Sequence, residues 1–324
     1  MKRLSRNLAV LIIAVTLAFS ATAQDDALSL VPANAATVGM ARLAEMRTSP
    51  LSSLLFRHVD KMSTGGEAET FLHEAGLHPL RDVDVIVVAT SPRTALGGEA
   101  DVLVVAEGRF QPERLAAALV SRGAVQKGAY LLFPETTRGS DGETGAVAFL
   151  SSSLAIAGNE RSVINALAAR AGGGTGFTSR GALAMDLGRI DRTATAWALV
   201  DVPRAARLTK GGTIDTGSGQ PGAALQVALK SVSTVAIWAK DTGATLQLAA
   251  TGLSNDTETL HLLEDALRGA LAALRMVANE KAPEMVPVLR RFDVDRRSDS
   301  ISVQGSIPAA ALHEVMAKKL AGMK

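Results

Sequence analysis

The chain has 324 residues, of which 34 are Lys or Arg and 32 are Asp or Glu, so its formal net charge is only +2. Aromatic residues make up 3% of it and cysteine is absent. This composition gives no basic footprint and few rings for nucleic acid, and it excludes disulfides and thiol chemistry.

Residues 1–23 have the three-part pattern of a secretory signal peptide. Lys2, Arg3 and Arg6 precede an apolar run over residues 8–19, and Ala-Thr-Ala follows at residues 21–23. The run is too short for a membrane-spanning helix, which needs about 20 apolar residues. We predict cleavage before Gln24 and an exported protein, periplasmic or extracellular, with no transmembrane segment after cleavage. The remaining chain has 31 basic and 32 acidic residues.

The first module is predicted over residues 24–172. A short strand is expected at 37–43, followed by helices at 51–59 and 67–75, and two apolar strands at 83–90 and 102–107. Pro112 opens an amphipathic helix. A hairpin (129–133 and 145–150), a short strand (154–157) and a helix (161–171) complete the module.

Residues 173–194 are predicted to be a linker with a short helix, and 195–324 a second module. Strands are expected at 195–202, 232–240 and 244–251, then a long amphipathic helix at 256–279 capped by Asn255 or Asp256. Alternating strands at 292–296 and 301–307 and a helix at 309–320 follow. The glycine-rich stretch 210–222 has one large hydrophobic residue, Ile214, and is expected to be a flexible loop.

The order of elements repeats between the two halves. The strands at 83–90 and 232–240, those at 102–107 and 244–251, and the helices at 112 and 256 correspond. We therefore predict an α+β fold of two similar modules, each an antiparallel-rich sheet with helices packed on one face. The alternative is one larger α+β domain.

Motifs for catalysis or cofactor binding are weak. Glycines 172–176 lack the lysine and hydroxyl ending of a phosphate-binding loop. The five histidines have no zinc spacing, Asp141 and Glu143 suit a hairpin turn, and residues 151–153 are three serines in a turn. No nucleophile motif is present. We predict no catalytic, metal or cofactor site and no enzyme activity, although a site assembled from distant residues stays open.

The densest charge cluster lies near the C-terminal strands. Arg290, Arg291, Arg296 and Arg297 flank the alternating acidic residues Asp293 and Asp295. Such alternation suits the solvent face of a strand. The four arginines are nevertheless the candidate interaction surface of this sequence.

Several phrases of the sequence resemble a family of uncharacterised secreted bacterial proteins. They cover residues 30–35, 49–51, 76–84, 108–110, 196–198 and 300–303. The resemblance implies an exported protein with a duplicated α+β module, a domain of unknown function. It implies no activity.

Three functions are compatible with these features. The first is a non-catalytic envelope protein that binds a partner or acts as a scaffold, the partner being an envelope protein or a lipid. The second is a periplasmic carrier that holds an apolar ligand or lipid between sheet and helices, and the third is a hydrolase without a recognisable motif. Close packing of Ala-rich helices on the sheet would argue against the carrier.

Overall fold

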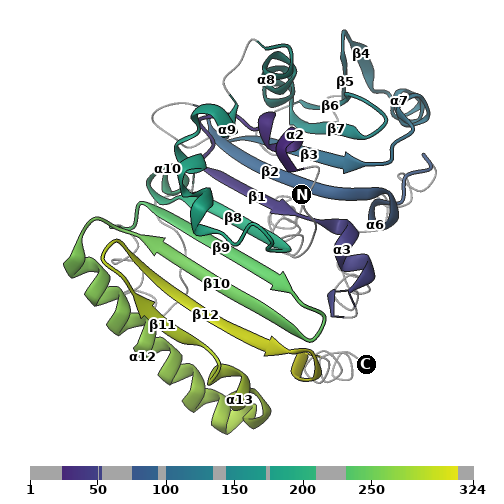
Figure 1. Cartoon of the computed structure of the whole chain (residues 1–324). Coiled ribbons are helices and arrows are strands. Elements are labelled where there is room, and N and C mark those ends of the chain that lie inside the picture. Colours follow the sequence, from purple (N-terminus) through teal and green to yellow (C-terminus); the bar gives the residue numbers. More distant parts are fainter. Residues whose placement is uncertain are drawn as a thin grey trace.

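A single antiparallel sheet of twelve strands organises the protein (Figure 1). The computed structural model describes residues 24–49, 51–52, 75–93, 100–133, 144–172, 176–208 and 231–312. The strand order is β11-β12-β10-β9-β8-β1-β2-β3-β7-β6-β5-β4. The strands are β1 (Thr37–Ala41), β2 (Val83–Pro92), β3 (Ala100–Gly108), β4 (Val125–Lys127), β5 (Tyr130–Leu132), β6 (Gly145–Phe149), β7 (Leu154–Asn159), β8 (Ala196–Asp201), β9 (Thr234–Asp241), β10 (Thr245–Leu253), β11 (Asp293–Arg296) and β12 (Ser300–Pro308).

Helices lie on both faces of this sheet. Those described are α2 (Gln24–Ser29), α3 (Leu43–Thr48), α6 (Pro79–Asp82), α7 (Pro112–Ser121), α8 (Glu160–Arg170), α9 (Phe177–Arg180), α10 (Val202–Leu208), α12 (Thr257–Lys281) and α13 (Val286–Leu289), with 3-10 helices η2 (Ala182–Arg189) and η3 (Pro283–Met285). We name the two faces of the sheet after the helices that pack on them, the α2 face and the α12 face.

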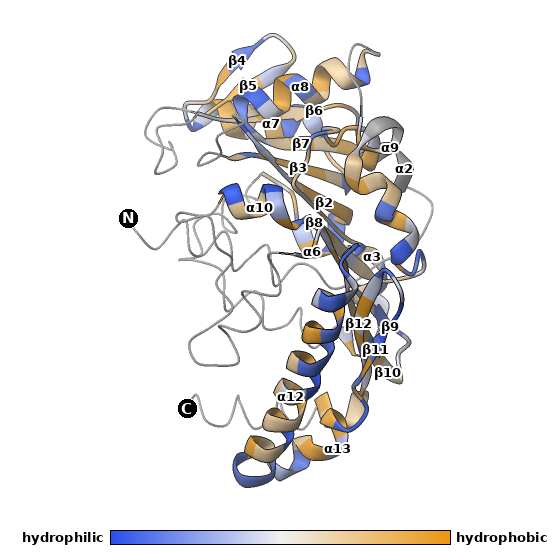
Figure 2. Cartoon of the chain, turned by 90° about the vertical axis from the view of Figure 1, so that its left-hand side faces the viewer, coloured by the Kyte–Doolittle hydropathy of each residue, from blue (hydrophilic) through white to orange (hydrophobic). Residues whose placement is uncertain are grey.

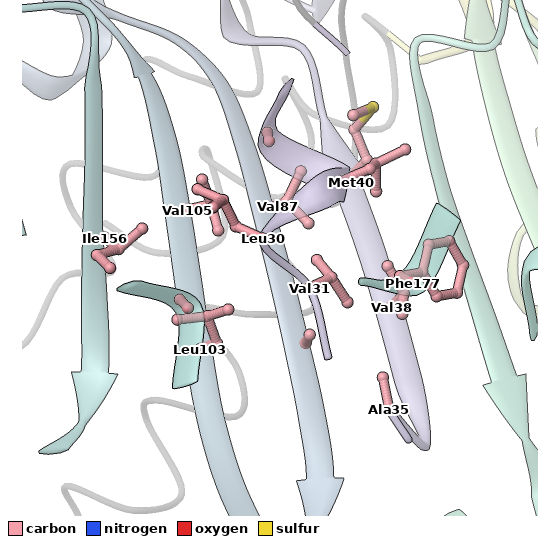
Figure 3. Packing of buried hydrophobic residues seen from close by; sticks show 14 of the residues in the cluster. Leu30, Val31, Ala35, Val38, Met40, Val87, Leu103, Val105, Ile156 and Phe177 are labelled. Atoms are coloured by element: carbon pink, nitrogen blue, oxygen red, sulfur yellow. The ribbon is translucent and has the colours of Figure 1, made fainter. Parts of the chain in front are cut away.

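The main core lies on the α2 face of the N-terminal half (Figure 3). Alternate residues of β1, β2 and β3, including Val38, Val87 and Val105, are fully buried there. Leu30 and Val31, just after α2, and Phe177 of α9 close over them. The backbone N–H of Ala27 donates a 3.0 Å hydrogen bond to the buried Glu107 carboxylate, which ties α2 to β3.

The α12 face carries separate apolar clusters. Leu43 and Met46 of α3 pack with Val83 and Leu115 near one end of the strands. At the C-terminal edge, Leu260 and Leu263 of α12 pack on Val294 and Ile301 of β11 and β12. Apolar clusters therefore pack against both faces of the sheet.

Helix α12 begins as the sequence predicted. The Asp256 side chain accepts a 3.0 Å hydrogen bond from the backbone N–H of Glu258, so Asp256 is the N-cap. Capping satisfies a backbone donor that has no partner within the helix. The helix extends to Lys281, two residues beyond the predicted end.

The α+β class with a large antiparallel sheet is confirmed, but two expectations about it are wrong. The modules do not have separate sheets, because β1 pairs with both β2 and β8 and so joins the halves edge to edge. Helices do not keep to one face in the N-terminal half, because β2 and β3 are apolar on both sides and apolar residues from helices pack on each side.

Residues 177–190, where a linker with a short helix was predicted, form α9 and η2. Phe177, Leu183 and Ile190 from this segment are buried in the main core. The predicted helices at 51–59 and 67–75, the turn at Asp141 and Glu143 and the loop at 210–222 lie wholly or mostly outside the described residues. No helix of the described residues is long and apolar enough to cross a membrane.

Candidate functional site

A row of apolar residues crosses the α12 face of the sheet, with one residue from each of eleven neighbouring strands. Direct cross-strand partners link its members one after another. In spatial order they are Leu131, Val147, Ala157, Val104, Val88, Gly39, Ala198, Ile237, Ala250, Val303 and Val294. We call this set the central row.

Described helices cover the two ends of the central row. At one end Leu131 is buried with Leu119 of α7, and Val147 packs against the same cluster. At the other end α12 covers Val294 and Val303. Between these ends the row is less covered. Ile237 is 46% exposed, and its neighbours from Ala157 to Ala250 are half-buried.

The rows on either side of the central row are also apolar. On one side Ala41, Ala196 and Ala239 are buried. On the other side Thr37 and Thr90 are cross-strand partners, and their hydroxyl oxygens are hydrogen-bonded at 2.7 Å. Because each hydroxyl has the other as a partner, this pair presents its methyl groups as well as satisfied polar atoms.

The opposite face of the C-terminal strands carries polar residues. Asp295, Ser302 and Thr251 are aligned partners there, as are Asp293 and Gln304. None of these residues is buried, and Asp293 and Gln304 are exposed. An antiparallel sheet with one wet face ordinarily looks like this. The partly exposed apolar residues of the α12 face therefore stand out as the candidate binding surface of the protein.

The four arginines predicted as an interaction surface do not lie on the central row. Arg296 donates to Glu264 at 2.8 Å, and Arg297 pairs with Asp295 at 3.4 Å. Hydrogen bonds from Arg296 and then from Arg268 lower the pKa of Glu264. Arg290 and Arg291 are exposed beyond the end of α13. The cluster thus divides into two ion-paired arginines and two exposed ones.

A partly buried Ser–Asp contact lies near the junction of the halves. The Asp241 carboxylate accepts hydrogen bonds from the backbone N–H of Ser52, at 3.1 Å, and from the hydroxyls of Ser49 and Ser52. This is the geometry of a cap at the start of a helical turn. Ser52 is only 1% exposed, so a substrate has no access to its hydroxyl. We assign the contact a structural role that links residues 189 positions apart.

The carboxylates with lowered pKa values in the N-terminal half and at its junction also have structural roles. Hydrogen bonds from Lys127 and Tyr130 lower the pKa of Glu160, and those from Thr193 are the main cause that lowers the pKa of Asp191. Serines 151–153 form the predicted turn. Of the histidines, His261 is exposed on α12 and His78 precedes α6. Within the described ranges no group of three or more His, Asp or Glu residues could hold a metal ion.

The sequence predicted all eleven strands of the central row, but it did not predict the row itself. The edge strand β4, which has no member in the row, was not predicted. The members of the row are up to 264 positions apart in the sequence, from Gly39 to Val303. Only the cross-strand register shows that they share one face at one level. A one-residue slip in any strand would move its member to the opposite face.

No protein-family model matches the chain, and no curated protein matches it. Among solved structures it is similar to crystal forms I, III and IV of TP0453. Form I has a TM-score of 0.48 and 9% identity, over 92% of this chain and 99% of that chain. Forms III and IV have TM-scores of 0.47 and 0.44 at 11% identity, over 92% and 89% of this chain and 100% and 95% of theirs. Similarity at this level carries no inference about function.

Proposed function

We propose that the protein is an exported, non-catalytic binding protein of the cell envelope, and that its ligand is an apolar chain lying on the central row. The observation that carries this proposal is the partial exposure of an unbroken apolar row between α7 and α12. Of the roles compatible with the sequence, the row favours the carrier of an apolar ligand over a scaffold.

The dimensions and chemistry of the row suit an acyl chain. Its less covered part runs over seven strands, from β7 to β10, which at ~4.8 Å between strands is about 30 Å. Two acyl chains end to end fill the ~30 Å hydrocarbon core of a bilayer, so one extended chain has ample room. Each methylene buried contributes ~0.8 kcal/mol, so binding requires no charged contact.

A hydrolase is less well supported by the same surface. The central row has no hydroxyl, carboxylate or imidazole group. Two buried serines of the described residues contact a carboxylate: Ser52 donates to Asp241, and Ser300 donates to the neighbouring Asp299 at 3.1 Å. General acid–base work needs a titratable group within hydrogen-bond reach of the substrate. A ligand on the central row would meet none from the row itself.

The test is binding of cis-parinaric acid, a fluorescent polyene fatty acid, to the mature chain. We expect saturable binding, and we expect Ile237→Asp to weaken it by about tenfold or more, because the new carboxylate must lose water against the acyl chain. Gln304→Asp places the same group on the exposed opposite face and should leave affinity unchanged. Absence of saturable binding, or equal losses in both variants, would contradict the proposal.

We further propose that the two halves are copies of one module. Supporting this, β1-β2-β3-β7-β6 and β8-β9-β10-β12-β11 run outward from the central β1–β8 pair in matching order. A helix directly follows the first strand in each half, α3 or α10, and another follows the third strand, α7 or α12. The β4–β5 hairpin is an addition to the first copy.

A further inference from the structure

Helix α12 has a second apolar surface, on the flank between its sheet-facing side and its solvent-facing side. Leu260 and Leu263 face the sheet and are buried, whereas Leu262 is 61% and Val277 51% exposed. At about 3.6 residues per turn, the positions between them on one side of the helix are all small residues. We call this the α12 stripe, consisting of Leu262, Ala266, Gly269, Ala270, Ala273 and Val277. Figure 2 shows apolar positions interleaved with polar ones along the helix.

The sizes of the residues in the α12 stripe are symmetric about its midpoint. Its midpoint lies between Gly269 and Ala270, and each member has a counterpart of similar size at the same distance on the other side. The counterparts are Leu262 with Val277, Ala266 with Ala273, and Gly269 with Ala270. An interface between identical chains related by a two-fold axis brings residue i against j and j against i. With the axis at this midpoint, each residue of the stripe would meet its counterpart in the partner chain.

Small residues in the middle of the stripe favour another helix as the occupant. Gly269 has no atom within 4 Å of the position that a Cβ would take, so space is open around it. Two helices can approach closely where small residues meet, and the larger Leu262 and Val277 would then pack against each other at the two ends. The stripe therefore fits an antiparallel copy of itself.

The charges along α12 are complementary in the antiparallel arrangement. The first half of the helix exposes Glu258 and Asp265 and one cation, Arg268, and the second half exposes Glu280 and Lys281. Arg275 donates to the carbonyls of Leu289 and Phe292, which brings exposed Arg290 and Arg291 to the second half. Antiparallel pairing places the acidic half of one helix beside the basic half of the other and opposes the helix dipoles.

The same charges disfavour a membrane surface as the occupant. Helices that lie on anionic membranes are rich in Lys and Arg on the polar face. Alongside its stripe, α12 exposes three carboxylates, Glu258, Asp265 and Glu280, and only two cations, Arg268 and Lys281. These carboxylates would be repelled by anionic headgroups.

We propose that the protein forms a two-fold symmetric dimer through antiparallel pairing of α12, with Leu262 of each chain against Val277 of its partner. This surface is distinct from the central row, so the dimer and the proposed ligand can be tested independently.

Sedimentation of the mature chain tests the dimer. We expect a concentration-dependent dimer that Ala273→Glu weakens by at least about tenfold, because a charge would be buried without a partner. Ala272→Glu is the matched control, one residue away and outside the stripe, and should sediment as the wild type does. A wild type that stays monomeric at high concentration, or equal losses in both variants, would overturn the proposal.

The absence of cysteine makes the register directly testable. The two positions 262 and 277 are about 22 Å apart on one helix at ~1.5 Å per residue, too far for an internal disulfide. Oxidation should therefore crosslink Leu262→Cys/Val277→Cys into a dimer, and neither single variant. Crosslinking of the single variants alone would indicate a parallel pair and sink the antiparallel one. Co-flotation of the wild type with anionic vesicles, lost in Ala273→Glu, would overturn the assignment of the occupant.

Discussion

Individual carboxylates in the described part of the chain act as caps and ion-pair partners. Asp256 caps α12, Asp241 accepts from Ser49 and Ser52, and Glu160 accepts from Tyr130 at 2.6 Å and from Lys127 at 2.7 Å. The hydrogen bonds to Asp256 and Glu160 lower the pKa of these two carboxyl groups, because the ionised group is the better acceptor. These residues lie away from the central row and contribute to folding rather than to chemistry.

Glu160 gives a pH-dependence prediction. Its pKa is lowered in the fold by hydrogen bonds from Lys127 and then Tyr130, so its stabilising contribution is present above the ordinary value of about 4.3. That contribution is lost as the pH falls through the lowered folded value. We expect the urea midpoint of the wild type to exceed that of Glu160→Gln at pH 7, and the difference to shrink below about pH 4. Glu113→Gln, also in the first turn of a helix, is the control. A difference that widens on acidification would contradict this account.

Among the elements, α12 combines two apolar surfaces of different use. Leu260 is fully buried against β11 and β12, and Asp256 sets the start of the helix so that Leu260 and Leu263 both reach the sheet. The amphipathic pattern that predicted the helix could not assign its apolar positions to two partners. Burial in the structure separates those facing the sheet from the α12 stripe.

The cost of truncation should follow burial in these helices. Leu260→Ala removes a side chain with no exposure and should lower the free energy of unfolding by about 2–5 kcal/mol, since it leaves a cavity. Val120→Ala, at a position of α7 that is 49% exposed, should change it by about 0.5 kcal/mol or less. Denaturant unfolding measures both. A small effect of Leu260→Ala would show that α12 is not held by its buried face.

At the scale of the whole molecule, the β1–β8 pairing makes one sheet out of two similar strand sets. Met40 lies opposite Trp197, and Trp197 lies opposite Trp238 in β9. Both tryptophans thus belong to the C-terminal half of the sheet, whereas the main core lies mostly in the N-terminal half. The pairing of β1 with β8 across the junction should couple the unfolding of the two halves.

That coupling can be measured with the natural tryptophans. Leu103→Ala truncates a side chain of β3 that is 1% exposed. Strand β3 is three strands from β8 in the sheet. We expect it to shift the unfolding midpoints seen by tryptophan fluorescence and by far-UV circular dichroism equally, because one cooperative unit gives coincident transitions. A tryptophan transition that stays in place while the dichroism splits into two steps would show that the halves unfold separately.

Much of the secondary structure could be predicted because it depends on residues close together in the sequence. The apolar runs of β2 and β3, the alternation in β12, the proline at the start of α7 and the cap at Asp256 are each written within a few residues. Their physical causes are equally local. Side chains alternate between the two faces of a strand, proline lacks a backbone N–H, and the first N–H groups of a helix have no acceptor within it. The sequence alone thus determined the α+β class and the position of most elements.

The tertiary structure decided which face and which neighbour each element has. The single sheet depends on the pairing of Gly39 with Ala198, and the central row depends on the register of eleven strands. Which apolar residues of α12 pack on the sheet and which stay exposed depends on where the sheet ends. Pairing between distant strands is chosen by the packing of the whole chain, because an apolar strand has many compatible partners and only the complete sheet buries all of them together.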